Sequence, residues 1–389
     1  MISADWHLGA TDPNRFRLEL LRTVKHKLDK TKQLDLFVVA GDTFDMKEYL
    51  SSDTVKLYFN IMKELFDMTR EYDTQFRFIE GTSGHDAKQL ETLEVICDQI
   101  LDKDRIRFIH TVDTESFKGM DILYLPEEYV VDSNIYYKEY FSRHYDFIFG
   151  HGPTSLMWYM KGKNTVEHSS ATVFDVDQLC EIGNYCYFGH WHYNKAAGPD
   201  GRFKSIGPVS RWEFDKDGPC GMYFTWYDTS TKLAFEEYLE NEYAPILPTV
   251  AISIKKEVEL DELNNRIRQR INKKIDGADK LRLLVVIDSS LPNFITIKDF
   301  IMSSFGNTPK VHLMMDIVNK EDTENEEDIN LEEVTEKKIE ERPYLYDKTM
   351  RNEARIASYI KRKNGANIPL ENILEVINPK DNRIKSREE

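Results

Sequence analysis

The sequence predicts an α/β fold, and three observations predict it. Short apolar runs, such as those at 37–40 and 147–149, have the length expected of buried strands. Longer segments with apolar residues at helical spacing, such as 16–28, alternate with these runs. Five apolar runs end in Asp or His, and four of these ends contain glycine. Such ends are expected at the carboxyl edge of an α/β sheet, where the backbone approaches a bound group closely.

The elements of the first half follow one another in a regular order. Helices are expected at 16–28, 52–72 and 88–101, where apolar residues recur every three or four positions. Strands are expected at 34–40, 76–80, 106–110, 121–125, 146–150 and 185–188. A further helix is expected at 129–146, and closing strands within 203–227. This order favours a layered domain with a second sheet.

Two prolines in the segment 243–248 indicate a domain boundary. Strand-like segments follow at 250–255, 281–287 and 311–317, separated by helical segments at 260–275 and 296–305. We therefore expect a domain at 1–245, a small α+β module at 246–319, an acidic linker at 320–341 and a helical tail at 342–389. The two short amphipathic helices of the tail are expected to dock on a partner, and packing on the chain's own domain is the alternative.

Composition and charge narrow the class of protein. The chain has 389 residues, 41% of them hydrophobic, and no apolar run long enough for a membrane span or a signal peptide. The four cysteines have no zinc-module spacing and are expected to be reduced thiols in a cytoplasm. The net charge of −16 argues against a protein that coats nucleic acid unaided, although the segment 320–341 carries part of it. Any affinity for nucleic acid is then expected to be shared with a partner or supplied by metal ions.

Residues that can bind metals lie directly after the expected strands. Asp5 and His7 are two residues apart and point the same way across a pleat, where a carboxylate and an imidazole suit one divalent ion. Similar residues end the other four strands. They are Asp42 and Asp45, His85 and Asp86, His151, and His190 and His192. Five such ends predict a single site.

The order of these motifs, D-x-H, G-D-x-x-D, G-…-H-D, G-H and G-H-x-H, resembles that of the calcineurin-like metallophosphoesterases. Residues 5–9 and 41–45 are most similar to the SbcD branch, which comprises DNA double-strand-break repair nucleases and related phage recombination endonuclease subunits. The resemblance covers about the first 215 residues. It implies a four-layer α/β/β/α sandwich, a capping module that contacts DNA, and a homodimer. It also implies that the tail binds the coiled-coil root of an SbcC-like ATPase.

The resemblance and the chemistry together imply a two-metal site. Two ions about 3.5–4 Å apart supply a hydroxide, neutralise the phosphoryl oxygens and stabilise the leaving oxygen. Asp42 is expected to bridge them. Asp45 is expected to orient one of the metal-binding residues without binding an ion itself. The other ligands are assigned as Asp5, His7 and His192 for the first ion and His151 and His190 for the second. Mn²⁺ is the expected ion, with Mg²⁺, Fe²⁺ and Zn²⁺ left open.

His85 is the candidate general acid, or the group that stabilises the phosphate in the transition state. Asp86 is expected to hold its tautomer; a purely structural hydrogen bond is the alternative role for His85. The family has Gly-Asn-His-Asp or Gly-Asn-His-Glu here, and the Asn amide oxygen ligates the second ion. Gly84 stands at that position in this chain. Ser83, a backbone carbonyl or water is expected to replace the amide, or the second ion is weakly held.

The loop at 153–173 combines lysines with aromatic residues. Trp158, Tyr159, Lys161 and Lys163 suit phosphate contacts and base stacking, so this loop is the expected DNA-binding edge. An ordinary active-site loop is the alternative.

These features favour a metal-dependent DNA exonuclease or endonuclease subunit. It is expected to act with an SbcC-like ATPase in end processing, repair or recombination, in the cytoplasm of a bacterium or a phage-infected cell. A phosphoesterase acting on small molecules or phosphoproteins is the first alternative, but it leaves the capping module and the tail without a purpose. A metal-binding scaffold with little catalysis is the second; Gly84 favours it and the presence of His85 speaks against it.

Overall fold

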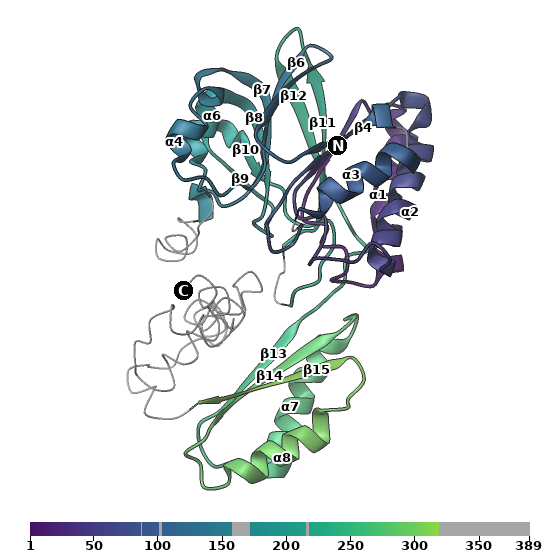
Figure 1. The fold of residues 1–389 in the computed structure, drawn as a ribbon. Helices are drawn as coiled ribbons and strands as arrows, with labels where there is room; N and C mark the ends of the chain where they lie inside the picture. Colours follow the sequence, from purple (N-terminus) through teal and green to yellow (C-terminus); the bar gives the residue numbers. More distant parts are fainter. Residues whose placement is uncertain (87, 101–102, 158–171, 215–217, 319–389) are drawn as a thin grey trace, which may run out of the picture. The chain divides into compact units, whose positions relative to one another are not determined.

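A computed structural model describes residues 1–86, 88–100, 103–157, 172–214 and 218–318. The described residues all belong to one compact unit. The described residues build a mixed α/β fold with two six-stranded sheets and one three-stranded sheet (Figure 1), so the prediction of an α/β fold is confirmed. No helix in this part of the chain has the length and apolarity needed to cross a membrane. The expected linker and tail lie outside the described residues.

The first sheet contains the strands that precede Asp5, Asp42 and His85. Its strands lie in the order β12-β11-β1-β2-β3-β4. They span Ile2–Ser3 (β1), Leu36–Ala40 (β2), Gln75–Ile79 (β3), Ile106–Ile109 (β4), Gly221–Asp228 (β11) and Leu233–Glu240 (β12). Strands β1 to β4 are parallel to one another, and β11 pairs antiparallel with β1. The carboxyl ends of β1, β2 and β3 therefore lie at one edge of the sheet.

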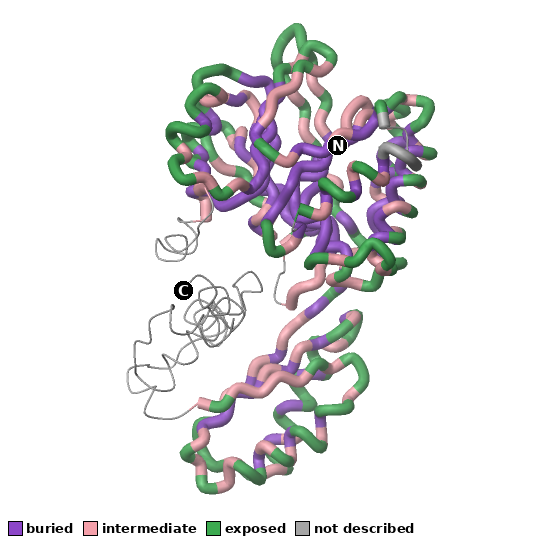
Figure 2. Tube along the Cα trace, in the orientation of Figure 1, coloured by how far each residue is buried: buried purple, intermediate pink, exposed green. Residues whose placement is uncertain are grey.

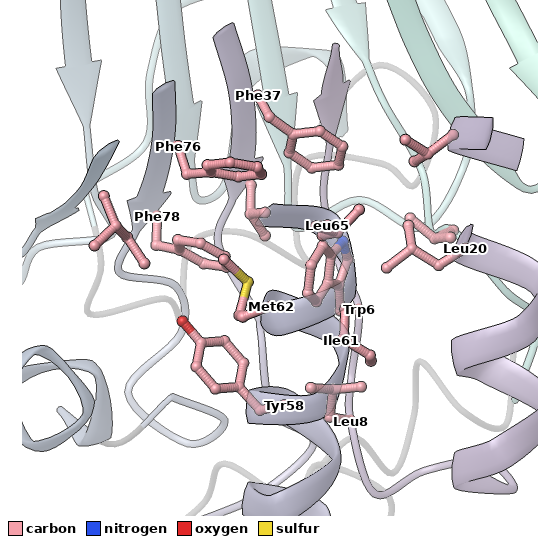
Figure 3. Close-up of a cluster of buried hydrophobic side chains, with 14 of the residues drawn as sticks. Trp6, Leu8, Leu20, Phe37, Tyr58, Ile61, Met62, Leu65, Phe76 and Phe78 are labelled. Atoms are coloured by element: carbon pink, nitrogen blue, oxygen red, sulfur yellow. The ribbon is translucent and has the colours of Figure 1, made fainter. Parts of the chain in front are cut away.

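Three helices pack on one face of this sheet: α1 (Pro13–Thr31), α2 (Asp53–Met68) and α3 (Gln89–Ile100). The side chain of Asp12 accepts a hydrogen bond from a backbone N–H in the first turn of α1, and Ser52 caps α2 in the same way. Figure 3 shows apolar side chains of α1 and α2 packed against phenylalanine rings of β2 and β3.

Trp6 lies between the first two ligand candidates and anchors their loop. Its buried ring is edge-on to Phe78, with the ring centroids 5.8 Å apart (Figure 3), and its indole N–H donates to Ser3 Oγ at 3.0 Å. Replacing such a core tryptophan by alanine typically costs about 3–5 kcal/mol of folding free energy. The hydrophobic core thus fixes the backbone on which Asp5 and His7 are mounted.

The second sheet has the order β5-β6-β7-β8-β10-β9. Its strands span Asp113–Phe117 (β5), Met120–Leu125 (β6), Tyr145–His151 (β7), Gly183–Gly189 (β8), Lys195–Ala197 (β9) and Phe203–Ser205 (β10). Strands β6, β7, β8 and β10 are parallel. An apolar layer that includes Tyr124, Phe149 and Tyr187 packs this sheet on the first one, and α6 (Val176–Ile182) packs on its other face. Figure 2 shows buried residues following the strands of both sheets.

The third sheet has a core of its own. Its parallel strands are β13 (Thr249–Ile254), β14 (Leu281–Asp288) and β15 (Val311–Val318), with the helices α7 (Leu260–Ile275) and α8 (Phe294–Phe305). Ile252, Leu283 and Ile297 are among its fully buried residues. The strands and helices expected in this region are therefore present, while the domain boundary at 243–248 stays a prediction.

The helix predicted at 129–146 is wrong for most of its length. The structure has one short helix, α4 (Ser133–Tyr136), and a 3₁₀ turn at Tyr140–Ser142 before β7 begins at Tyr145. Aromatic residues are weak helix formers, so their packing decides the local structure. Tyr137 and Tyr145 are both buried, and the Tyr145 hydroxyl donates to the Tyr140 carbonyl at 2.9 Å.

His110, directly after β4, predicts a pH-dependent stability. Its Nδ1 lies 2.8 Å from Glu80 Oε2 and its Nε2 3.2 Å from Glu94 Oε2, and these contacts raise the pKa of His110 despite partial burial. A raised folded-state pKa stabilises the fold below about pH 6.5, and this contribution is lost as pH rises through the folded-state value. We expect His110→Gln to lower the melting temperature more at pH about 6 than at pH about 9. Equal losses at both values would contradict this ion pair.

Candidate metal centre

Two groups of His and Asp side chains lie at the carboxyl edge of the strands, and they share one carboxylate. Within each group every residue offers a ligand atom, and these atoms lie within 4.8 Å of one another. The first group contains Asp5, His7, Asp42 and His192, and the second contains Asp42, His151 and His190. The structure thus brings together the six side chains to which the sequence assigned metal binding. Since three loops and the end of β7 contribute to the groups, the site exists only in the folded chain.

Asp42 lies between the two groups. Its Oδ2 is 3.6 Å from His7 Nε2 and 3.2 Å from His151 Nε2, while its Oδ1 accepts a hydrogen bond from the Thr82 N–H at 2.7 Å. Burial by itself would raise the pKa of Asp42, but attraction to His151 and His7 lowers it well below the ordinary value. The carboxylate is therefore an anion that faces both groups.

The backbone at the site adopts conformations that non-glycine residues rarely adopt. Asp5, His7, Asp42 and His190 have φ angles of 50°, 43°, 50° and 86°. Such strain persists only where surrounding contacts impose it, and it is typical of functional sites. The first two loops are tied together, since the N–H groups of Asp5 and His7 donate to the carbonyls of Gly41 and Asp42 at 3.1 and 3.0 Å.

A hydrogen bond sets the tautomer of His151, and a contact with a carboxylate orients the ring of His7. The Nδ1 of His151 lies 2.8 Å from the Ala40 carbonyl, which can only accept, so Nδ1 carries a proton and Nε2 faces Asp42. The Nδ1 of His7 lies 3.4 Å from Asp45 Oδ1, and its Nε2 faces Asp42 and His192. Asp45 therefore lies where the sequence expected an orienting residue. An outer carboxylate or carbonyl that fixes the ring in this way is usual for metal-binding histidines.

The residues of the first group fit a divalent cation. Asp5 Oδ2 is buried and has no hydrogen-bond partner among the described residues, although its Oδ1 accepts from the His190 N–H at 2.9 Å. A buried carboxylate oxygen without a donor is costly, and a cation would remove that cost. His7 Nε2 and His192 Nε2 lie only 3.2 Å apart, as two ligands of one ion would. Imidazole and carboxylate donors without thiolates suit Mn²⁺, Fe²⁺ or Zn²⁺.

The charge around His151 is consistent with a cation site. Burial would lower the pKa of His151, but attraction to Asp42, Asp5 and Glu127 raises it to about 10. The surrounding carboxylates thus strongly favour a positive charge at this position. His190 and His192 are partly exposed, with 23% and 18% of their side-chain surfaces accessible, so the site is reachable from solvent.

His85 lies beside the first group. Its Nδ1 is 2.5 Å from the Asp45 carbonyl, and its ring centroid is 4.5 Å from that of His7. This carbonyl, and not Asp86 as predicted, sets the tautomer of His85. Asp86 turns into the protein, where its two oxygens accept from the N–H groups of Phe44 and Gly81 at 3.1 and 2.8 Å, and burial raises its pKa. Asp86 therefore holds two loops together.

The prediction for the residues between Gly81 and His85 also needs correction. Ser83 and Gly84 are exposed, and Ser83 Oγ donates to the Tyr129 hydroxyl at 3.2 Å. Thr82 is buried instead, and its Oγ1 lies 3.3 Å from both Asp42 Oδ2 and His190 Nδ1. The bond from its N–H to Asp42 fixes Thr82 in the site, so the two residues after it are pushed outward.

Two residues near the groups were not identified from the sequence. Glu127, two residues after β6, places Oε2 3.1 Å from His190 Nδ1, and the ring of Trp212 has its centroid 4.2 Å from that of His7. An acidic residue after the apolar run 121–125 was the one signal for Glu127. Nothing in the sequence distinguished Trp212. The expected DNA contacts Trp158, Tyr159, Lys161 and Lys163 lie outside the described residues.

Gly81→Ala is expected to disturb Asp42 directly. A Cβ on Gly81 would lie 2.1 Å from Asp42 N and 2.4 Å from its Oδ1, too close for either residue to keep its position. We expect Mn²⁺ affinity, measured by isothermal titration calorimetry, to fall about 10–100-fold, as when outer partners of metal ligands are lost. Gly218→Ala is the control, because its Cβ would meet nothing closer than Tyr193 Cδ1 at 3.6 Å. Unchanged affinity in a folded Gly81→Ala protein would contradict this role.

The chain matches no protein-family model and no curated protein.

Proposed function

We propose that the chain is a calcineurin-like metallophosphoesterase with a four-layer sandwich, and that it is a metal-dependent DNA nuclease subunit. The observation that supports this most strongly is the position of Asp42, whose carboxylate faces His7 at 3.6 Å and His151 at 3.2 Å. A carboxylate shared by two groups of His and Asp ligands suits a pair of divalent ions. A structural metal site would need only one group, closed on all sides.

Two bound ions would supply an activated water and neutralise charge on the phosphate. The other functions belong to the chain's own residues. Asp5, Asp42 and the four histidines would hold the ions. His85 donates its Nδ1 proton to the Asp45 carbonyl, which leaves Nε2 free to exchange a proton with a leaving oxygen or to bind the phosphate. Trp212 contacts His7 and His192 and so shields these rings from water.

DNA is proposed as the substrate because of features outside the metal groups. The motifs at 5–9 and 41–45 are most similar to the SbcD branch, and the loop at 158–163 combines lysines with aromatic residues. The third sheet has its own core and is not needed to build the metal groups, so a second task is proposed for it, contact with DNA. With a net charge of −16, strong binding to DNA is expected to need help. An SbcC-like ATPase bound to the tail at 342–389, and a second copy of the chain, are the proposed partners.

Cleavage of end-labelled linear double-stranded DNA by the purified chain with Mn²⁺ tests this proposal. A chromogenic phosphodiester should be assayed in parallel. We expect DNA cleavage by the wild-type chain and by His144→Ala, an exposed histidine that belongs to neither group and precedes the first residue of β7, whereas His151 is its last. We expect none by His151→Ala. Turnover of the ester alone, even with the ATPase and ATP present, would indicate a phosphoesterase with another substrate. Mn²⁺ binding without any turnover would indicate a scaffold.

A further inference from the structure

The hydroxyl of Thr82 lies at the centre of a cluster of ligand-type atoms. Its Oγ1 is 3.3 Å from Asp42 Oδ2, 3.1 Å from Glu127 Oε2, 3.4 Å from His151 Nε2 and 3.3 Å from His190 Nδ1. A hydroxyl has one hydrogen and can donate to only one of these atoms. The cluster therefore contains more ligand-type atoms than the single hydroxyl hydrogen of Thr82 can bond.

Glu127 contributes a carboxylate to this cluster. Only 3% of its side-chain surface is exposed, and buried carboxylates are normally paired or bound to metals. The Tyr129 hydroxyl donates to Oε1 at 3.0 Å, which leaves Oε2 directed at His190 Nδ1, 3.1 Å away, and towards His151 Nε2, 3.9 Å away.

We propose that Glu127, assisted by Thr82, is a ligand of the second metal ion and takes the place of the amide ligand that the chain lacks. Ligand atoms held about 2.1 Å from one ion at right angles lie about 3 Å apart. The separation of 3.1 Å between Glu127 Oε2 and His190 Nδ1, and that of 3.2 Å between Asp42 Oδ2 and His151 Nε2, match this spacing. The inference rests on the proposed two-ion site.

The same distances also fit a second role for Glu127, namely holding the His190 ring through an Nδ1–H···O bond. The two roles differ in their need for charge. A glutamine in place of Glu127 still offers an oxygen that can accept from His190. It lacks the negative charge that attracts a divalent ion, and an amide oxygen is a weaker ligand than a carboxylate. Glu127→Gln therefore separates a ligand from an orienting residue.

The number of Mn²⁺ ions bound per chain, measured by equilibrium dialysis and by electron paramagnetic resonance, tests the proposal. We expect two ions in the wild type, with the broadened spectrum of a coupled pair. In Glu127→Gln the affinity for one ion should fall about a hundredfold or more, given that loss of an outer partner alone costs about 10–100-fold. At limiting Mn²⁺ its spectrum should then be the six-line signal of an isolated ion.

Two further variants make the outcome decisive. Glu128→Gln is the matched control, because Glu128 accepts from the Val112 N–H and the Tyr136 hydroxyl and belongs to neither group. Thr82→Val, which removes only the hydroxyl, should weaken the same ion less than Glu127→Gln does. Circular dichroism checks that each variant is folded.

The results separate this inference from the proposed function. Two ions bound by Glu127→Gln with wild-type affinity would overturn the role of Glu127 and leave the two-ion site intact. Fewer than two ions in the wild type would instead overturn the proposed function on which the inference rests.

Discussion

Asp42→Ala is expected to abolish Mn²⁺ binding at both groups and to reduce DNA cleavage by about three orders of magnitude or more. Even a single hydrogen-bond donor in a preorganised site contributes two to three orders of magnitude to catalysis. Asp42 is the one side chain common to both groups. Its removal leaves His7 and His151 without the carboxylate that lies 3.6 and 3.2 Å from them. The measurements are calorimetric titration with Mn²⁺ and the cleavage assay.

The control for this variant is Asp29→Ala, an exposed aspartate on α1. It should keep wild-type binding and cleavage. Retention of one ion at full affinity in Asp42→Ala would show that the two groups are independent. Cleavage at the wild-type rate would mean that neither group takes part in the reaction.

His85→Gln is expected to lower kcat for DNA cleavage by about two to four orders of magnitude while the number of bound ions stays at two. The reason is its position: His85 lies beside His7, with ring centroids 4.5 Å apart, but belongs to neither of the groups that contain Asp42. Its Nε2 is the nitrogen left free by the bond to the Asp45 carbonyl. Rates and Mn²⁺ titrations of the same preparation separate the two effects.

His26→Gln, an exposed histidine of α1, is the control and should behave as the wild type. Because His7, Asp45 and His85 also lie close enough to share an ion, a fall in Mn²⁺ affinity in His85→Gln would identify His85 as a ligand. An unchanged kcat would leave it the structural role of bonding to the Asp45 carbonyl.

The position of the site was predictable because its residues follow strands in a recognisable way. Asp5, Asp42 and His151 each come directly after or at the end of a short buried strand, and parallel strands bring such ends together. The glycines had a physical reason as well: a Cβ on Gly41 would lie 2.1 Å from His151 Nδ1. The residue types, their positions at the ends of the strands and the neighbouring glycines together were sufficient to predict that these side chains form one site.

The residues that were missed carry no such pattern. In the motif Gly-Asn-His-Asp the amide ligand directly precedes the histidine, so the alignment on His85 placed Gly84 at the position of this ligand. The loop from Gly81 to His85, however, has more residues than the motif. The extra residues could lie before or after the position that enters the site. The hydrogen bond from the Thr82 N–H to Asp42 decides this, and it exists only in the folded chain. Glu127 and Trp212 reach the groups from single positions after β6 and β10, where no spacing rule applies.

The secondary structure was predictable where apolar residues recur at the regular spacing of a helix or a strand, and it was not predictable where this spacing is absent. The strand β12 alternates apolar and acidic residues irregularly, and Leu233 and Phe235 are exposed on it, so it gave no clear signal. In 129–146 the tyrosines are placed by contacts with distant residues, such as the ring of Tyr137 against that of Phe174. Local spacing could not reveal those contacts.

Anomalous X-ray diffraction from crystals grown with Mn²⁺ tests the two-ion site most directly. We expect two peaks about 3.5–4 Å apart, one on each side of the Asp42 carboxylate. The first should lie among Asp5, His7 and His192, and the second among His151, His190 and Glu127. A single peak, or peaks away from Asp42 in crystals saturated with Mn²⁺, would contradict it.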